Sequence, residues 1–172
     1  MPQLTLWLCC PLLGTNVQEI DAIEDYIRVR GHSPGITIYA GPMTQDALLS
    51  LADAWIAHWL AGEGSLEREA TAWATDLYRL EYEDPETLWL LILTIHSKDQ
   101  SRRIQEVLSA GPVESLLVKH GDRFIERIEV QAQQDPKFAR LLGGVWMNTM
   151  PDSIRQRLQR VWDRRGWDGI PE

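Results

Sequence analysis

Hydrophobic side chains recur every three or four residues from about residue 44 to residue 165, which is the spacing of amphipathic helices. Residues that favour the first turn of a helix divide this stretch into short segments. The expected helix starts are Thr44, Ser65, Asp84-Pro85, Asp99, Pro112, Asp122, Asp135-Pro136 and Pro151. The pattern predicts a mainly α fold, a compact bundle of short helical hairpins, for which a HEAT-like stack is one arrangement.

Residues 1–43 show a different pattern. The runs at 4–10 and 36–40 are β-prone and bounded by proline or glycine, which predicts two short strands. Between them, Asn16 and Glu19 have the spacing of a capping box at the start of a helix. We therefore expect an N-terminal β-α-β element in residues 1–43, a helical domain in 44–165 and a flexible tail in 166–172.

The positions of glycine, proline and tryptophan add detail to the prediction for the helical part. Gly111 before Pro112 and Gly121 before Asp122 predict two helix ends, whereas the nearly uniform apolar run 88–95 predicts a central buried helix. Most tryptophans fall on the apolar faces of the expected helices, so we expect them in the core. These are Trp55, Trp59, Trp73, Trp89, Trp146 and Trp162.

The charge is uneven along the chain. The net charge is −8, and residues 1–100 carry 5 basic and 15 acidic side chains against 12 and 10 in residues 101–172. This balance argues against binding to nucleic acid and leaves two readings: ordinary solvated faces, or an acidic surface that meets a basic partner. The two cysteines, Cys9 and Cys10, are adjacent and build no disulfide framework, so we expect a cytoplasmic protein. No apolar run reaches the length of a membrane span, and no motif calls for a metal or cofactor.

One group of side chains could carry chemistry. Glu114, His120 and Glu126 lie close in sequence, and carboxylates near a histidine can act as general acid and base. Arg123 and Arg127 lie among them, however, and this pattern is also that of a solvated helix face with ion pairs. Because no catalytic motif accompanies these residues, the sequence favours a protein that is not an enzyme.

Two features could contact a partner. The segment 81–86 holds four carboxylates, Glu81, Glu83, Asp84 and Glu86, which serve either a basic partner or only helix capping and solubility. Trp7 and Trp167 lie outside the helical pattern and would be anchors for a partner if exposed. Five arginines between residues 155 and 165 are expected to pair with the acidic first half of the chain rather than with nucleic acid.

Residues 46–161 resemble a bacterial family of helical proteins classed as a domain of unknown function. The residues that carry the likeness are Ala54-Trp55-Ile56, Glu83-Asp84-Pro85-Glu86, Leu88-Trp89 and, above all, the stretch 110–146 with His120-Gly121, Asp135-Pro136-Lys137-Phe138 and Leu142-Gly143-Gly144-Val145-Trp146. The resemblance implies an all-helical bacterial cytoplasmic protein and implies no activity.

Three functional hypotheses follow from these observations. The first is a non-enzymatic protein–protein interaction module, such as an inhibitor, an immunity-type protein or an adaptor of a bacterial system. The second is an enzyme with a dispersed carboxylate and histidine site at Glu114, His120 and Glu126. The third is a structural protein that self-assembles through an edge strand in residues 1–43.

Overall fold

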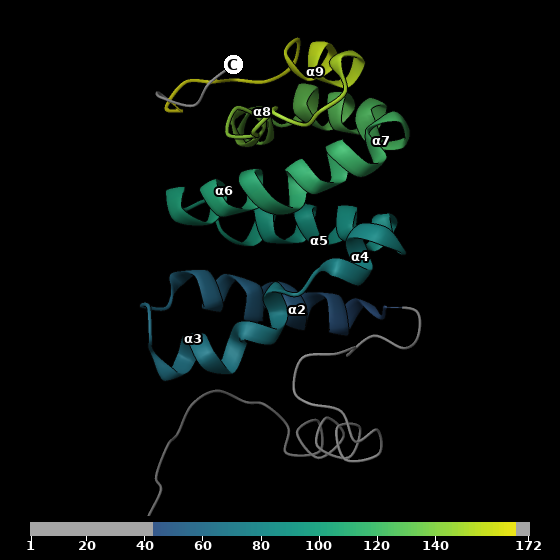
Figure 1. Ribbon diagram of the computed structural model, residues 1–172. Coiled ribbons are helices and arrows are strands. Elements are labelled where there is room, and N and C mark those ends of the chain that lie inside the picture. The colour runs from purple at the N-terminus through teal and green to yellow at the C-terminus, as the bar shows by residue number, and fades with distance from the viewer. Residues whose placement is uncertain (1–42, 168–172) are drawn as a thin grey trace, which may run out of the picture. The chain divides into compact units, whose positions relative to one another are not determined.

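The computed structural model describes residues 43–167, and the expected β-α-β element and Trp7 lie outside this range. The described part is mainly helical and contains no strand. Eight α-helices are joined by a 3-10 helix, η1, and a π-helical turn, η2 (Figure 1). They are α2 (Gln45–Leu60), α3 (Leu66–Thr71), η1 (Ala72–Thr75), α4 (Tyr78–Tyr82), α5 (Pro85–Lys98), α6 (Arg102–Leu108), η2 (Ser109–Val113), α7 (Glu114–Gln134), α8 (Pro136–Leu142) and α9 (Asp152–Leu158).

Side-chain caps start four of the helices where the sequence predicts them. The oxygens of Thr44, Ser65 and Asp84 each accept a hydrogen bond of 3.2 Å from a backbone N–H three residues further on. Asp135 accepts one of 2.9 Å from the N–H of Lys137. Such bonds satisfy N–H groups that the first helical turn leaves without a partner.

The helices follow one another through space in nearly the order of the sequence. Figure 1 shows α2 with α3 in one layer, α5 in the next beside a helical run that leads from α6 through η2 into α7, and finally α8 and α9. α2 packs against α5 and α6, α5 packs against α7, and α7 packs against α8 and α9. Every residue of the run 88–95 is buried except Leu90, Leu93 and Thr94, so the predicted central helix is confirmed as the middle of α5.

Two predicted helix boundaries are wrong. Asp99 ends α5 and Ser101 caps α6, because the Asp99 carboxylate accepts from the N–H of Ser101 instead of starting a helix itself. The chain continues through Pro112 into α7 by a π-helical turn. The break predicted at Gly121 is present as a kink inside α7, where His120 has the non-helical backbone angles φ −134° and ψ 20°. Gly121 is buried against Ile154, where a Cβ atom would lie 2.9 Å from the isoleucine Cγ1.

The tryptophans divide between core and surface. Trp55 and Trp89 are buried as predicted, and Trp59 and Trp162 are partly buried against the core. The prediction is wrong for Trp73 and Trp146, which are 39% and 49% exposed. Both lie outside the α-helices in which the hydrophobic spacing places them. Trp73 lies in the 3-10 helix η1, and Trp146 lies in the segment after α8.

None of the helices between residues 43 and 167 combines the length and the apolar character needed to cross a bilayer.

Candidate functional site

The acidic segment 81–86 is paired with α7. Glu86 accepts hydrogen bonds from Arg123 at 2.8 Å and from Arg127 at 2.6 Å, and Glu81 forms an ion pair with Lys119. The hydrogen bond from Arg127 is the main cause that holds the pKa of the Glu86 carboxyl below its usual value. We call this set of contacts the α4–α7 clasp, because it ties the end of α4 and the start of α5 to α7.

The two remaining carboxylates of the segment also have partners in the chain. Glu83 lies 3.4 Å from Arg79 in an ion pair on α4. Asp84 accepts from the hydroxyl of Thr87 at 2.6 Å as well as capping α5. All four carboxylates that the sequence offers to a basic partner are therefore used within the chain, and a partner would have to displace these bonds.

The structure does not bring Glu114, His120 and Glu126 together. The Nε2 atom of His120 lies 2.7 Å from the backbone oxygen of Glu81, and Glu126 is exposed. Glu114 is partly buried at the start of α7, and burial raises the pKa of its carboxyl. Between residues 43 and 167, no hydrogen bond or ion pair joins any two of the three.

Metal binding finds no support in the described part of the chain, where no three His, Cys, Asp or Glu side chains are grouped so that they could hold an ion.

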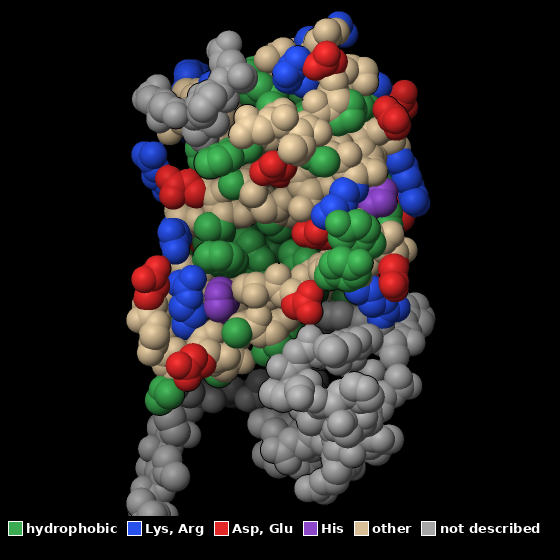
Figure 2. All heavy atoms as spheres, in the orientation of Figure 1, with side chains coloured by type: hydrophobic (Ala, Val, Ile, Leu, Met, Phe, Trp, Pro, Cys, Tyr) green, Lys and Arg blue, Asp and Glu red, His purple; other side chains and the backbone are tan. Residues whose placement is uncertain are grey.

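Aromatic side chains are exposed along the segment that follows α3. Tyr78 and Tyr82 are 65% and 53% exposed, and their ring centroids lie 4.5 Å apart on one side of α4. The ammonium group of Lys119 lies 4.4 Å from the centroid of the Tyr82 ring. Trp73, in η1 of the same segment, is 39% exposed, and we call these three exposed side chains the aromatic surface. Figure 2 shows hydrophobic side chains gathered over α4 and in a hollow between the α2–α3 layer and the α5–α6 layer.

The spacing of the two tyrosines in the sequence already indicates that they lie side by side. Tyr78 and Tyr82 are four residues apart and therefore share one face of a helix. The residues on either side, Arg79, Glu81 and Glu83, are charged, so this face of α4 is not a core face.

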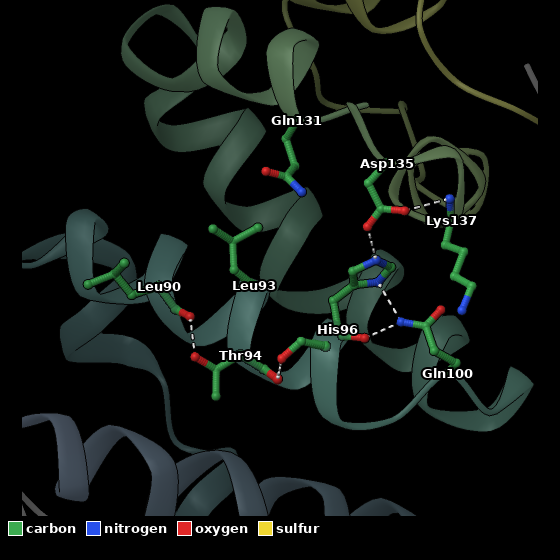
Figure 3. Close-up of a pocket in the computed structure, with 9 residues that line it drawn as sticks. Leu90, Leu93, Thr94, His96, Gln100, Gln131, Asp135 and Lys137 are labelled. Carbon is green, nitrogen blue, oxygen red and sulfur yellow. Dashed lines mark hydrogen bonds and ion pairs between the residues drawn. The ribbon is translucent and has the colours of Figure 1, made fainter. Parts of the chain in front are cut away.

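A buried histidine joins three parts of the fold. His96 on α5 is 4% exposed, and its Nε2 atom lies 3.1 Å from Asp135 Oδ2 at the junction of α7 and α8 (Figure 3). Its Nδ1 atom lies 2.9 Å from Gln105 Oε1 on α6. The amide nitrogen of Gln105 donates to the backbone oxygen of Asp99 at 2.7 Å, which fixes the amide oxygen on the side of the histidine.

Both ring nitrogens of His96 thus have partners within the chain: Asp135 at Nε2, and Gln105 with the more distant amide nitrogen of Gln100, at 3.5 Å, at Nδ1. Burial works against ionisation of the Asp135 carboxyl. Hydrogen bonds from the backbone N–H of Lys137 and from His96 outweigh burial, and the pKa of Asp135 lies below its usual value. Because the ring is buried and both of its nitrogens contact groups of other helices or turns, the arrangement serves as an anchor between helices.

Two pockets open beside this anchor. The first, of about 690 Å³, is lined by residues of α5 together with Gln131, Asp135 and Lys137 (Figure 3). The second, of about 370 Å³, lies between the start of α6, α8 and the C-terminal segment, and Lys137 lines both. We call the second the basic pocket, because its lining includes Arg102, Lys137, Arg140 and Arg165.

Trp167 forms part of the basic pocket. Its indole N–H donates to the backbone oxygen of Arg140 at 2.7 Å, and its ring lies against Gly143 and Gly144. Of the expected flexible tail, the structure describes Gly166 and Trp167, and the Trp167 ring is placed against α8 and the two glycines that follow it. Trp167 is also only partly exposed, since its indole is already used within the chain.

The arginines near the C-terminal end pair within the chain, as expected, but with carboxylates of the second half instead of the first. Arg157 donates two hydrogen bonds to Glu129, at 2.9 and 2.6 Å. Arg165 binds both oxygens of Asp163, and this hydrogen bonding lowers the pKa of Asp163 to about 2.

Comparison with known proteins identifies the family of the chain and nothing more specific. No curated protein and no solved structure is similar enough to the chain to match it. Residues 61–166 match a family of unknown function, DUF6869. The match spans more than half of the chain and confirms, over most of residues 46–161, the resemblance to a family without an assigned activity. The chain belongs to the DUF6869 family of unknown function.

Proposed function

We propose that the protein is a non-enzymatic protein-binding module and that its partner contacts the aromatic surface formed by Trp73, Tyr78 and Tyr82. The observation that carries the proposal is the exposure of these three large aromatic side chains within one short segment. Tryptophan and tyrosine are the residues that most often dominate the free energy of protein association. They bury a large area at little cost in side-chain entropy, since each has only two rotatable side-chain bonds.

The surroundings of the aromatic surface support this role. The charged groups next to the tyrosines already have partners: Lys119 pairs with Glu81, Arg79 pairs with Glu83, and the Asp76 carboxylate accepts from the backbone N–H of Tyr78 at 3.3 Å. A partner could therefore cover the tyrosine rings without burying an unpaired charge. Burial of an unpaired charge would cost on the order of several kcal/mol. An apolar or aromatic partner surface fits this arrangement better than a strongly charged one.

The histidines support a module that does not perform catalysis. His58, His96 and His120 each have a ring nitrogen within 3.1 Å of a backbone or side-chain oxygen. Each contact links separate helices or turns, which is a structural role. We propose that the layered helices act as a HEAT-like scaffold that presents the aromatic surface, in an inhibitor, an immunity-type protein or an adaptor of the bacterial cytoplasm.

The test is a comparison of the wild-type chain with the variant Y78S/Y82S and with the control variant L66S/V130S. Leu66 and Val130 are 83% and 51% exposed, so the control removes a similar exposed apolar area elsewhere. The partner is captured from a lysate of the source organism, identified, purified and titrated against all three chains by calorimetry.

We expect one identified protein to bind the wild type and the control alike, and to bind Y78S/Y82S at least tenfold more weakly. A loss of more than about 1.4 kcal/mol corresponds to that factor and is the size expected for an interface anchor. Equal affinity for all three chains, or no protein retained reproducibly, contradicts the proposal. A dimer of this chain that Y78S/Y82S dissociates would instead assign the surface to self-assembly.

A further inference from the structure

The basic pocket is an exception to the charge of the molecule. The chain carries a net charge of −8, yet four cationic side chains and no carboxylate line this pocket. The four cations come from three separate parts of the fold: Arg102 from α6, Lys137 and Arg140 from α8, and Arg165 from the C-terminal segment. Their convergence is a property of the tertiary structure and not of a run of basic residues in the sequence.

Carboxylates of the described residues lie next to three of these four cations. Arg165 is hydrogen-bonded to Asp163, which also lies 3.8 Å from Arg140, and Arg102 is bonded to Glu106 at 2.7 Å. Among residues 43–167, the ammonium group of Lys137 has no carboxylate partner. Within that range, the four cations of the pocket thus meet two carboxylates, neither of which lines the pocket itself.

Hydrogen bonds within the chain hold the walls of the pocket. Gln105 is buried, and both ends of its amide are held, one by His96 and the other by the backbone oxygen of Asp99. Opposite, Trp167 is fixed by its hydrogen bond to Arg140. A second bond ties the same C-terminal segment to α8, from the backbone N–H of Asp163 to the backbone oxygen of Ala139, at 2.8 Å. A pocket that is already formed loses little entropy when it binds a ligand.

We propose that the basic pocket binds a small phosphate-bearing anion, such as a diphosphate group. Guanidinium groups present paired N–H donors that match phosphate oxygens, and a lysine adds a point charge. The volume of about 370 Å³ lies within the range of small-molecule sites. The aromatic ring of Trp167 at the edge of the pocket can contact an apolar or planar part of such a ligand.

This site is independent of the proposed protein-binding function, because the basic pocket and the aromatic surface share no residue. Loss of one activity should leave the other unchanged, so the two proposals can be tested separately on the same full-length chain.

The experiment titrates inorganic pyrophosphate into the full chain by calorimetry. The pocket variant is K137Q/R140Q, and the control is R155Q/R160Q, which removes the same two charges on and just after α9. Lys137, Arg140 and Arg160 are exposed, and the side chain of Arg155 is 39% exposed. We therefore expect neither variant to disturb the core. A third variant, R165Q, changes a side chain that is 82% exposed and tests the opposite wall.

We expect one pyrophosphate per chain, with affinity at least tenfold weaker in K137Q/R140Q, several-fold weaker in R165Q and within twofold of the wild type in R155Q/R160Q. The indole N–H signal of Trp167 in an NMR spectrum should shift during the titration. No saturable binding at millimolar pyrophosphate, or an equal loss in the control, overturns the proposal. Tighter binding of a glutamate-rich peptide than of pyrophosphate also overturns it.

Discussion

The imidazole of His96 and the carboxylate of Asp135 lie 3.1 Å apart although 39 residues separate them in sequence. His96 is also held by Gln105, so one buried ring connects α5, α6 and the junction of α7 with α8. The ring packs edge-on against Phe138, with the centroids 5.4 Å apart. The contact is therefore a polar link inside an apolar layer. Its loss should weaken the packing of three helices.

Replacing His96 with leucine should destabilise the fold. The substitution keeps a side chain that fills the space but removes the ring nitrogens that contact the Gln105 oxygen and one Asp135 oxygen. A buried group left without its hydrogen bond costs about 1–3 kcal/mol, and we expect a loss near the middle of that range. Urea unfolding followed by circular dichroism measures it, and D135N, which keeps an oxygen at the cap, should cost less than H96L. A loss below about 0.5 kcal/mol in H96L contradicts the anchoring role.

Asp163 should make the fold sensitive to acid. Hydrogen bonds from Arg165 lower its pKa from 3.8 to about 2 in the folded chain. Because the folded value is the lower one, the stabilisation is fully present above about pH 4 and disappears as the pH falls towards 2. The free energy of unfolding, measured between pH 2 and pH 6, should therefore fall less steeply below pH 4 in D163N than in the wild type. Parallel curves for the two proteins would show that Asp163 has no such role.

The α4–α7 clasp should contribute modestly and lose strength in salt. Glu86 meets two arginines from α7 but is 45% exposed, so E86Q should cost about 0.5–1 kcal/mol at low ionic strength. High salt screens exposed charges and should reduce this cost by about half or more. E83Q is the control, because Glu83 pairs only within α4, at 3.4 Å, and is 68% exposed. Equal effects of E86Q and E83Q on urea unfolding would show that the clasp adds nothing between helices.

Local signals explain which parts of the fold the sequence predicts. Thr44, Ser65, Asp84 and Asp135 cap helices because a short polar side chain reaches its own backbone, and this depends on neighbouring residues alone. Gly121 is expected at a helix end, and α7 does bend at the preceding residue, His120. The close contact of Gly121 with Ile154 on α9 could not be predicted in the same way, because it depends on a helix more than thirty residues further along the chain.

The candidate sites were less accessible to sequence reasoning. The basic pocket combines residues from positions 100 to 167, and no spacing pattern along the chain predicts that they lie together. The acidic segment 81–86 is visible as a run, yet its partners Lys119, Arg123 and Arg127 are more than thirty residues away. Sequence therefore indicates which charges exist, whereas the packing of α7 decides which of them remain available to a ligand.

The pair Gly143-Gly144 should be essential for docking the C-terminal segment. A Cβ atom on Gly144 would lie 2.5 Å from the Ser109 hydroxyl and 2.6 Å from the Trp167 ring, and both neighbours are held by other contacts. We expect G144A to lower the free energy of unfolding by about 1–3 kcal/mol, the usual cost of overpacking, and to shift the indole N–H signal of Trp167.

Gly111 provides the matched control for this prediction, because a Cβ atom there meets nothing within 4 Å. Alanine loses less backbone entropy than glycine on folding, so G111A should leave stability unchanged or raise it by up to about 1 kcal/mol. The same methyl group thus has opposite effects at two glycines, according to the space around each. If G144A and G111A unfold at the same urea concentration, the C-terminal segment does not lie against Gly144. The wall that Trp167 provides to the basic pocket would then be absent as well, and pyrophosphate binding would have to depend on α6 and α8 alone.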